Sequence, residues 1–315
     1  MTREYSANTL KYNRYRNPFA LGLPAPANLP KVHPDRFPLL HTSRKQTVML
    51  TLLSPAKSLD ETPHAAGVAA SEPRFPAQTE RLLKSLKRLK PKAIGALMDI
   101  SKALSELNFR RYQGFEDQVA MPAVFMFDGD VYTGLQAREL DDAGLAWAQD
   151  HVRILSGLYG CLRPLDAIRP YRLEMGSTLK CGRANTLYEF WGDTIARSLT
   201  AELKAQGQDT LVNLASHEYA RAALTKALKL RVVSPRFLEI KGNEARIVSF
   251  FAKKARGLMA RFMIDHRIDR ADGLKDFNVA GYVFRRDLST EDDWTFTRPQ
   301  PELVGAARAR ALEEA

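Results

Sequence analysis

A pair of glycines separated by two residues marks the first segment whose residue types suit chemistry. Gly157 and Gly160 lie in LSGLYGCLRP, between an apolar-periodic stretch over 140–155 and a short one over 165–168. We interpret this as two helices joined by a glycine turn, similar to a helix-hairpin-helix element, although that element usually has one residue between its glycines. Glycine lets a turn approach a phosphate, and the unpaired N–H groups that open the second helix point at the anion. The glycine turn is expected to approach the backbone of duplex DNA, and Arg163 would add a positive charge beside it. A packed glycine turn between two core helices is the alternative.

The second segment is a run of basic residues over 226–261. It holds ten Lys or Arg against two Glu, a surplus of +8 in 36 residues. It falls on a predicted hairpin and on the first turns of a predicted helix, where Lys253, Lys254 and Arg256 lie. Cations at that end oppose the helix dipole, at a cost of about 0.3–1 kcal/mol each. We therefore expect these three side chains to bind an anion, and we assign them to the same DNA-binding surface.

The third feature is a set of polar and aromatic side chains in short apolar contexts, PYRLEM, FWGD and ASHEY. If residues 170–175 are extended, Arg172 and Glu174 share one face of the chain. Such side chains are typical of a pocket, and no catalytic residue is assigned among them. A network of buried salt bridges explains the same residues. The candidate pocket residues are Lys57, Tyr132, Arg172, Glu174, Asp193 and Lys253.

The usual metal and cofactor motifs are absent from the sequence. Its six histidines are scattered, without H-E-x-x-H or a Cys/His cluster, so no metal site is expected. The patterns of common hydrolase, P-loop and dinucleotide sites, G-x-S-x-G, G-x-x-x-x-G-K-[ST] and G-x-G-x-x-G, do not occur either. We therefore expect no cofactor, and we favour a binding protein over an enzyme.

Alternating strands and helices must position these residues. The patterns predict strands over 48–53, 124–127 and 210–214, a β-hairpin around Gly242-Asn243, and a late strand pair over 282–284 and 294–296. They predict helices over 77–89, 92–100, 101–112, 187–203, 216–228 and 253–268. No linker interrupts this alternation. The expected fold is a single α/β domain over 49–298 with a mixed β-sheet surrounded by helices.

More than half of the net positive charge lies outside that domain. The chain has 315 residues and a net charge of +11, of which residues 1–48 carry +6 together with six of the 17 prolines. We expect residues 1–48 to be a disordered extension and residues 299–315 to be a loose C-terminal tail. The apolar runs fall well short of the roughly 20 residues that span a bilayer. The two cysteines form no C-x-x-C pair and nothing signals an oxidising compartment, so we expect a cytoplasmic protein. We expect no membrane partner, because the apolar runs are short. We expect no obligate protein partner, because the sequence shows no exposed apolar stripe.

Long ungapped strings in this sequence also resemble a known family. They include LSPAKSLD from residue 53, GDVYTGL from 129, LSGLYGCLRPLDAIRPYRLEM over 155–175, LYEFWGD from 187, NLASHEY from 213 and FAKKARGLM from 251. These strings are similar to those of the YaaA-like peroxide stress resistance family of bacterial proteins. The resemblance covers residues 49 to about 298, and the first 48 residues depart from the family pattern.

The resemblance implies a cytosolic protein of the hydrogen peroxide response that limits damage by intracellular free iron. It also implies DNA binding through a basic cleft and a helix-hairpin-helix-like element on a single-domain α/β fold. Carried over from the family by motif, the DNA-binding residues of that element would be Ser156, Gly157, Tyr159, Gly160 and Arg163, and those of the basic cleft would be Lys253, Lys254 and Arg256. Our leading hypothesis is therefore binding of duplex DNA without strong sequence specificity. The alternative is an enzyme that acts on a nucleotide or another phosphorylated small molecule in the polar pocket.

Overall fold

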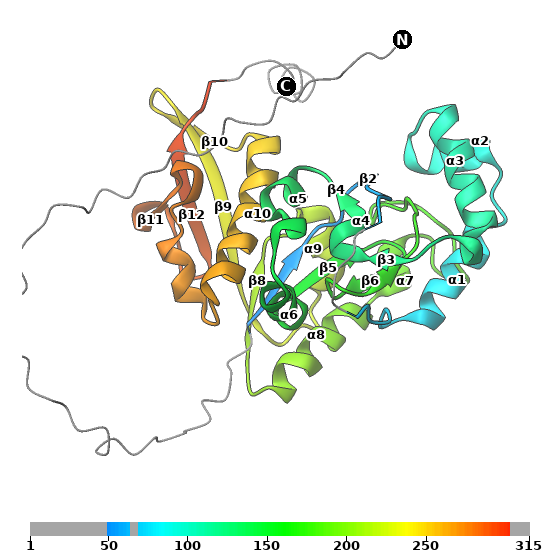
Figure 1. Cartoon of the computed structure of the whole chain (residues 1–315), viewed down its shortest axis with the longest axis horizontal. Coiled ribbons are helices and arrows are strands. Elements are labelled where there is room, and N and C mark those ends of the chain that lie inside the picture. Colours follow the sequence, from blue (N-terminus) through cyan, green and yellow to red (C-terminus); the bar gives the residue numbers. More distant parts are fainter. Residues whose placement is uncertain (1–48, 64–68, 303–315) are drawn as a thin grey trace, which may run out of the picture. The chain divides into compact units, whose positions relative to one another are not determined.

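The computed structural model describes residues 49–63 and 69–302 (Figure 1). The disordered extension predicted over residues 1–48 lies outside the described residues, and so does most of the predicted C-terminal tail. All helices, strands and contacts named below belong to the described part of the chain.

Among the described residues, one sheet has eight strands in the order β11-β12-β9-β8-β1-β5-β6, with β10 paired to β9 (Figure 1). Strands β5, β1, β8, β9 and β12 are parallel to their neighbours in this series, whereas β6, β10 and β11 are antiparallel to theirs. The mixed sheet and the α/β class are as predicted. The strand bounds are β1 Leu50–Leu53, β5 Val152–Ser156, β6 Gly160–Leu162, β8 Thr210–Asn213, β9 Arg231–Lys241, β10 Glu244–Arg246, β11 Val283–Arg285 and β12 Asp293–Pro299.

Two short strand pairs lie outside this sheet. Strand β2 (Ser58–Leu59) pairs with β4 (Phe127–Asp128), and β3 (Met121–Pro122) pairs with β7 (Ala167–Ile168). The first pair joins the loop that follows β1 to the turn at residues 128–130. It therefore forms part of the wall of the site described below.

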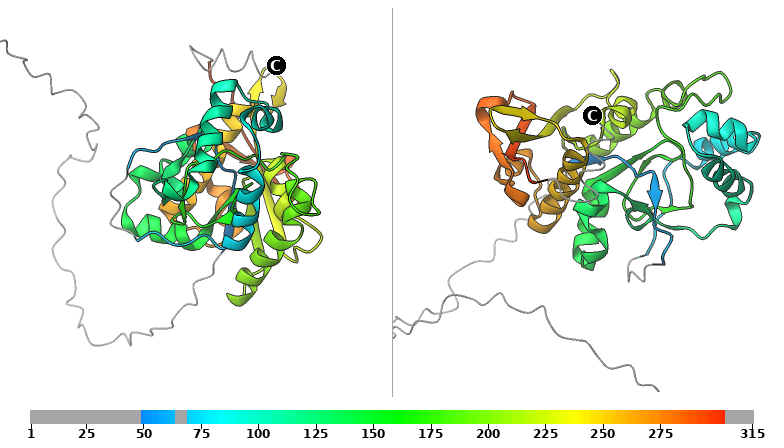
Figure 2. Two further views of the ribbon diagram at one scale, coloured as in Figure 1. Left: turned by 90° about the vertical axis from the view of Figure 1, so that its right-hand side faces the viewer. Right: turned by 90° about the horizontal axis from the view of Figure 1, so that it is seen from above.

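Helices cover both faces of the main sheet. Figure 2 shows α6 and α10 on one face and α8 and α9 on the other. The buried Thr51 hydroxyl on β1 donates to Met263 Sδ on α10, at 3.5 Å, which fixes one of these contacts. The α-helices are α1 Pro76–Leu86, α2 Pro91–Met98, α3 Lys102–Gln113, α4 Ala123–Met126, α5 Asp130–Leu135, α6 Asp142–His151, α7 Leu187–Trp191, α8 Thr194–Ala205, α9 His217–Ala223 and α10 Ser249–His266. The 3₁₀ helices are Phe115–Asp117, Ala137–Glu139, Ala271–Asp276, Val279–Gly281 and Arg286–Leu288.

The glycine turn is not a helical hairpin, and that prediction is wrong. Helix α6 ends at His151, and the chain continues as β5, which pairs antiparallel with β6 in the register Ser156↔Gly160. The segment is therefore a β-hairpin, and residues 167–168 form β7 instead of a second helix. Every residue of β5 is buried. The apolar residues of β5 continue the apolar pattern of α6, so periodicity alone does not show where the helix ends and the strand begins.

A true pair of packed helices occurs earlier in the chain. Helices α2 and α3 lie side by side, joined by residues 99–101, in the cyan part of Figures 1 and 2. Asp99 has a left-handed φ of 50° and ends α2, and the Ser101 hydroxyl caps α3 by accepting from Leu104 N–H at 3.3 Å. The helix predicted over 101–112 thus starts within one residue of the expected position.

The strand order contains a point where the direction of the topology reverses. From β1 the chain proceeds to β5 on one side of β1, and later it returns to form β8 on the opposite side. In open sheets of parallel strands, ligands bind in the crevice outside the carboxyl ends of the strands at such a switch point. The carboxyl ends of β1 and β8 are therefore where a site is expected.

Candidate functional site

A cavity of about 490 Å³ opens where β1 and β8 end, and we call it the switch-point cavity. Its volume lies within the range of small-molecule sites, which is about 300–1,000 Å³. The loop after β1, the turn before α5, the first residues of α9 and the second turn of α10 contribute its walls. The lining residues are Ser54, Pro55, Ala56, Lys57, Ser58, Asp128, Gly129, Asp130, Val131, Tyr132, Ser216, Glu218, Tyr219, Lys253 and Arg256.

Hydrogen bonds hold the two strand-end loops together. The Ser54 hydroxyl accepts from Ser216 N–H at 2.8 Å, and the Tyr132 hydroxyl donates to the Ser54 carbonyl at 3.1 Å. Burial raises the pKa of the Tyr132 phenol well above its ordinary value, so this hydroxyl remains a donor. Ser54 is therefore the point at which the loops after β1 and β8 and helix α5 are joined.

The wall formed by α5 and α10 depends on a close approach of two backbones. A Cβ at Gly257 would lie 1.8 Å from the Val131 carbonyl oxygen, and a Cβ at Gly134 would lie 2.2 Å from the Lys254 carbonyl oxygen. Only glycine allows this separation. The contact places Arg256 of α10 in the same cavity as the first turn of α5.

Arg256 is half-buried, whereas Lys57 and Lys253 are exposed. Burial lowers the pKa of the Arg256 guanidinium, because removal from water disfavours the charged form. In the described part of the chain, this guanidinium makes no hydrogen bond or ion pair. A desolvated charge without a counter-ion is costly. An anion bound beside Arg256 would therefore compensate this buried charge.

A second group of charges lies beside the cavity. Lys57 Nζ is 3.0 Å from Glu174 Oε2, and the Arg172 guanidinium donates to Glu174 Oε1 at 2.9 Å. Glu174 thus holds two cations with one carboxylate. Arg172 and Glu174, which we expected to share one face of the chain, form an ion pair, and Glu174 also anchors Lys57 at the rim of the cavity.

The structure brings most of the predicted pocket residues together. Lys57, Tyr132 and Lys253 line the cavity, and Arg172 and Glu174 adjoin it through the Lys57 ion pair. Asp193 does not take part. It accepts from the Thr225 hydroxyl at 2.7 Å and pairs with Arg197 at 3.5 Å, at the start of α8.

The residues predicted for DNA binding are divided. Arg256 and Lys253 line the cavity, and Lys254 is exposed outside its lining. Ser156, Gly157, Tyr159 and Gly160 are buried in the β5–β6 hairpin, so they present no surface to a duplex. Arg163 Nε donates to Asp166 Oδ1 at 3.1 Å, so this guanidinium is already paired with a carboxylate.

Sequence reasoning does not assign Ser54, Ser216 or Glu218 to a site. Ser54 follows directly after β1, and Ser216 and Glu218 lie at the start of α9, shortly after β8, so their position after a strand is the signal that finds them. That signal becomes usable only when the two strands are known to be parallel neighbours, because only then do their carboxyl ends meet.

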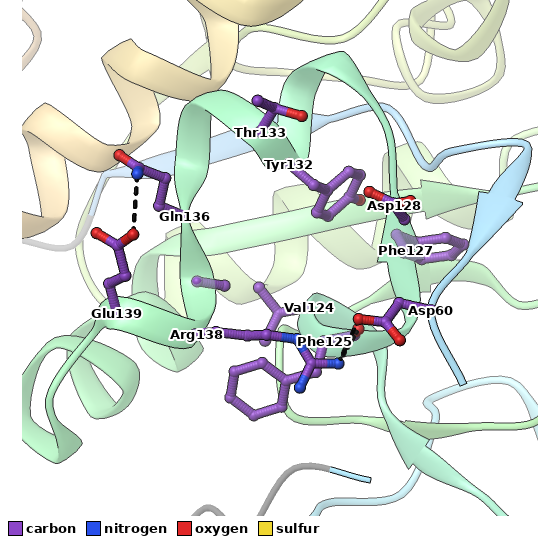
Figure 3. Close-up of a pocket in the computed structure, with 11 residues that line it drawn as sticks. Asp60, Val124, Phe125, Phe127, Asp128, Tyr132, Thr133, Gln136, Arg138 and Glu139 are labelled. Atoms are coloured by element: carbon purple, nitrogen blue, oxygen red, sulfur yellow. Dashed lines mark hydrogen bonds and ion pairs between the residues drawn. The ribbon is translucent and has the colours of Figure 1, made fainter. Parts of the chain in front are cut away.

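Figure 3 shows a second, smaller cavity of about 210 Å³. It shares Asp128 and Tyr132 with the larger one. Its arginine, Arg138, donates to Asp60 at 2.9 Å and lies over the Phe125 ring. Hydrogen bonds from Thr62, and then the charge of Arg138, lower the pKa of the Asp60 carboxyl. The arginine of this cavity is thus already paired with a carboxylate.

Neither a metal cluster nor a membrane-spanning helix is found within the described ranges. No group of three His, Cys, Asp or Glu in them is placed to hold a metal ion. No helix among these residues combines the length and the apolar character needed to cross a bilayer. Cys161 and Cys181 are free and buried, and burial raises the pKa of Cys161 to about 12. The Cys161 thiol therefore stays protonated, in the form that reacts poorly with peroxide.

The fold and site define an α/β protein with a polar cavity at the switch point of a mixed sheet. The chain belongs to the family described as peroxide stress protein YaaA, whose sequence model matches residues 49–288. A UPF0246 protein of Caulobacter sp. (strain K31) is 54% identical over 255 residues, which cover 80% of this chain and 100% of that protein. A UPF0246 protein of Phenylobacterium zucineum (strain HLK1) is 52% identical over 262 residues, or 82% of this chain and 98% of that protein.

Proposed function

We propose that this protein binds a small phosphorylated molecule in the switch-point cavity as part of the peroxide stress response. The observation that carries the proposal is the half-buried Arg256 guanidinium, which has no partner among the described residues and lines a cavity of about 490 Å³. Guanidinium groups bind phosphate through paired hydrogen bonds. In this proposal, binding serves the response that, as the family resemblance implies, limits damage by free iron.

The test compares Arg256→Gln with the wild type in calorimetric titrations with inorganic phosphate. Hydrogen bonds to charged groups contribute about 1.5–3 kcal/mol, so we expect phosphate affinity to fall about 10- to 100-fold. Without phosphate, the variant should unfold at the same or a higher urea concentration, because an uncompensated charge has been removed.

Lys254→Gln is the matched control for this test. It removes one positive charge from the same helix, but its side chain lies outside the cavity lining. The control should bind phosphate as the wild type does. Undiminished phosphate affinity in Arg256→Gln, or an equal loss in Lys254→Gln, would contradict the assignment of Arg256.

Binding of duplex DNA is a second candidate function, and the α2–α3 pair favours it. Residues 84–111 carry eight Lys or Arg against two acids, a surplus of +6. Arg88, Lys90, Lys92 and Arg110 are exposed and make no ion pair with any residue in the described ranges. Solvated cations on α2, on α3 and in the segment before α2 provide the electrostatic footprint that phosphate backbones require.

This second candidate predicts a specific salt dependence. Replacing Lys90 and Lys92 together with glutamine should flatten the plot of log K against log salt by about 1.8, because each phosphate contact contributes about 0.9. Titrations of duplex DNA at several salt concentrations measure this slope. The Lys253→Ala/Lys254→Ala double variant tests the stretch over 226–261 in the same way. If neither variant changes the slope, DNA binding at both surfaces is wrong.

A further inference from the structure

The switch-point cavity holds charges of both signs in equal number. Its cations are Lys57, Lys253 and Arg256, and its carboxylates are Asp128, Asp130 and Glu218. A polyanion entering the cavity would therefore meet as many repulsive as attractive side chains. The ligand that fits this balance has an anionic end and a second end that donates hydrogen bonds.

The anionic end belongs at Arg256. This guanidinium is the half-buried cation of the three, and it is unpartnered among the described residues. Lys57 is already 3.0 Å from Glu174, and its side chain is 64% exposed. Arg256 is thus the group that gains most from a phosphate.

The donating end belongs at Asp128 and Glu218. Glu218 Oε1 accepts from Gly176 N–H at 2.9 Å, which holds the carboxylate in place. Its Oε2 atom accepts no hydrogen bond from a residue in the described ranges, and neither does the Asp128 carboxylate. Ionised carboxylates are acceptors only, so they require donors from the ligand. Sugar hydroxyls are such donors, and an acidic residue binds ribose hydroxyls at the switch point of dinucleotide-binding sheets.

We infer that the ligand of the switch-point cavity is a phosphomonoester of a polyhydroxylated molecule, either a sugar phosphate or a nucleoside monophosphate. This inference rests on the proposed function, and it adds the chemical class of the ligand. The phosphate is bound by Arg256, and the hydroxyl groups donate to Asp128 and Glu218. Free phosphate can bind only at Arg256, and a neutral nucleoside can donate hydrogen bonds only to Asp128 and Glu218.

Calorimetric titrations of the full chain with four probes test this division. The probes are inorganic phosphate, ribose 5-phosphate, adenosine 5′-monophosphate and adenosine. We expect at least one of the two esters to bind about tenfold or more tightly than both phosphate and adenosine. Equal affinity for the two esters identifies the sugar phosphate as the recognised part, and a preference for the nucleotide shows that the base contributes.

The variants Asp128→Asn and Glu218→Gln separate the two ends of the cavity. Each should reduce ester affinity about threefold or more and leave phosphate affinity unchanged, whereas Arg256→Gln should weaken both. Glu106→Gln, which removes a carboxylate on α3 outside the cavity, is the control. Esters that bind no more tightly than phosphate would overturn the inference but leave Arg256-dependent phosphate binding intact. If the wild-type protein binds neither phosphate nor the esters, the proposed function itself is overturned.

Discussion

Replacing Gly257 with alanine is expected to lower the free energy of unfolding by about 3 kcal/mol or more. The added Cβ would lie 1.8 Å from the Val131 carbonyl oxygen and 2.9 Å from the Leu135 backbone nitrogen, both on α5. Neither neighbour is the end of a flexible side chain, so α5 and α10 must move apart. Because Arg256 precedes this residue, phosphate affinity should fall as well.

Urea denaturation measures the effect as a shift of the unfolding midpoint at constant slope. Gly134→Ala should behave similarly, since its Cβ would lie 2.2 Å from the Lys254 carbonyl oxygen. Gly114→Ala is the matched control, because its Cβ would meet Arg110 O at 3.7 Å and Asp117 Oδ2 at 3.8 Å. The control should change stability by less than about 1 kcal/mol. A Gly257→Ala protein as stable as the control would show that the helices are not in this close contact.

Removing the Glu202 carboxylate is expected to have an effect of comparable size. The Arg153 guanidinium, with 3% of its side chain exposed, donates to Glu202, and Arg74 Nη1 lies 2.9 Å from Glu202 Oε2. Deleting one partner of a buried ion pair costs about 3–5 kcal/mol, because the other charge stays buried without compensation. Glu202→Leu should therefore lose about that much stability in urea denaturation.

The pH dependence of stability gives an independent test of this cluster. Burial by itself would raise the pKa of Glu202, but hydrogen bonds from Arg153 and Arg74 outweigh it and lower the pKa. A carboxyl with a lowered folded-state pKa contributes stability that is fully present above its unfolded value, about 4.3. That contribution is lost as pH falls through the lower folded-state value. The stability difference between the wild type and Glu202→Gln should thus be constant near neutral pH and shrink in acid.

Glu106→Gln serves as the control for both measurements. Its carboxylate lies 4.0 Å from Lys102 Nζ in an exposed i,i+4 pair. Such pairs contribute little, so the change should stay within about 0.5 kcal/mol. A Glu202→Leu protein that unfolds at the same urea concentration as this control would mean that the cluster does not stabilise the fold.

Local patterns predicted the helices and strands whose signals depend on a few neighbouring residues. The serine cap at Ser101 marks the start of α3, and Gly242-Asn243 marks the hairpin between β9 and β10. Gly192, with φ 46°, breaks the single helix predicted over 187–203 into α7 and α8. A short apolar run misled the prediction over 124–127, where α4 occupies residues 123–126.

The candidate site was only partly predictable. Lys57, Tyr132 and Lys253 were predicted from residue type, and they line one cavity. Arg256 was predicted as an anion-binding residue from its place in the basic run. Its burial, and the absence of an ion pair to it within the described ranges, follow from the packing of α10 against α5 and could not be predicted. Asp193 has the same residue type as the carboxylates of the cavity, yet it lies at the start of another helix.

The sequence by itself determined the family, the α/β class, and the residue types available for binding an anion. Only the tertiary structure decided that the glycine pair at 157–160 closes a buried β-hairpin and that β1 and β8 are parallel neighbours. The physical reason is the range of the interactions involved. Caps and turns are set by residues a few positions apart, whereas the cavity depends on contacts between segments up to about 200 residues apart, such as the loop after β1 and helix α10.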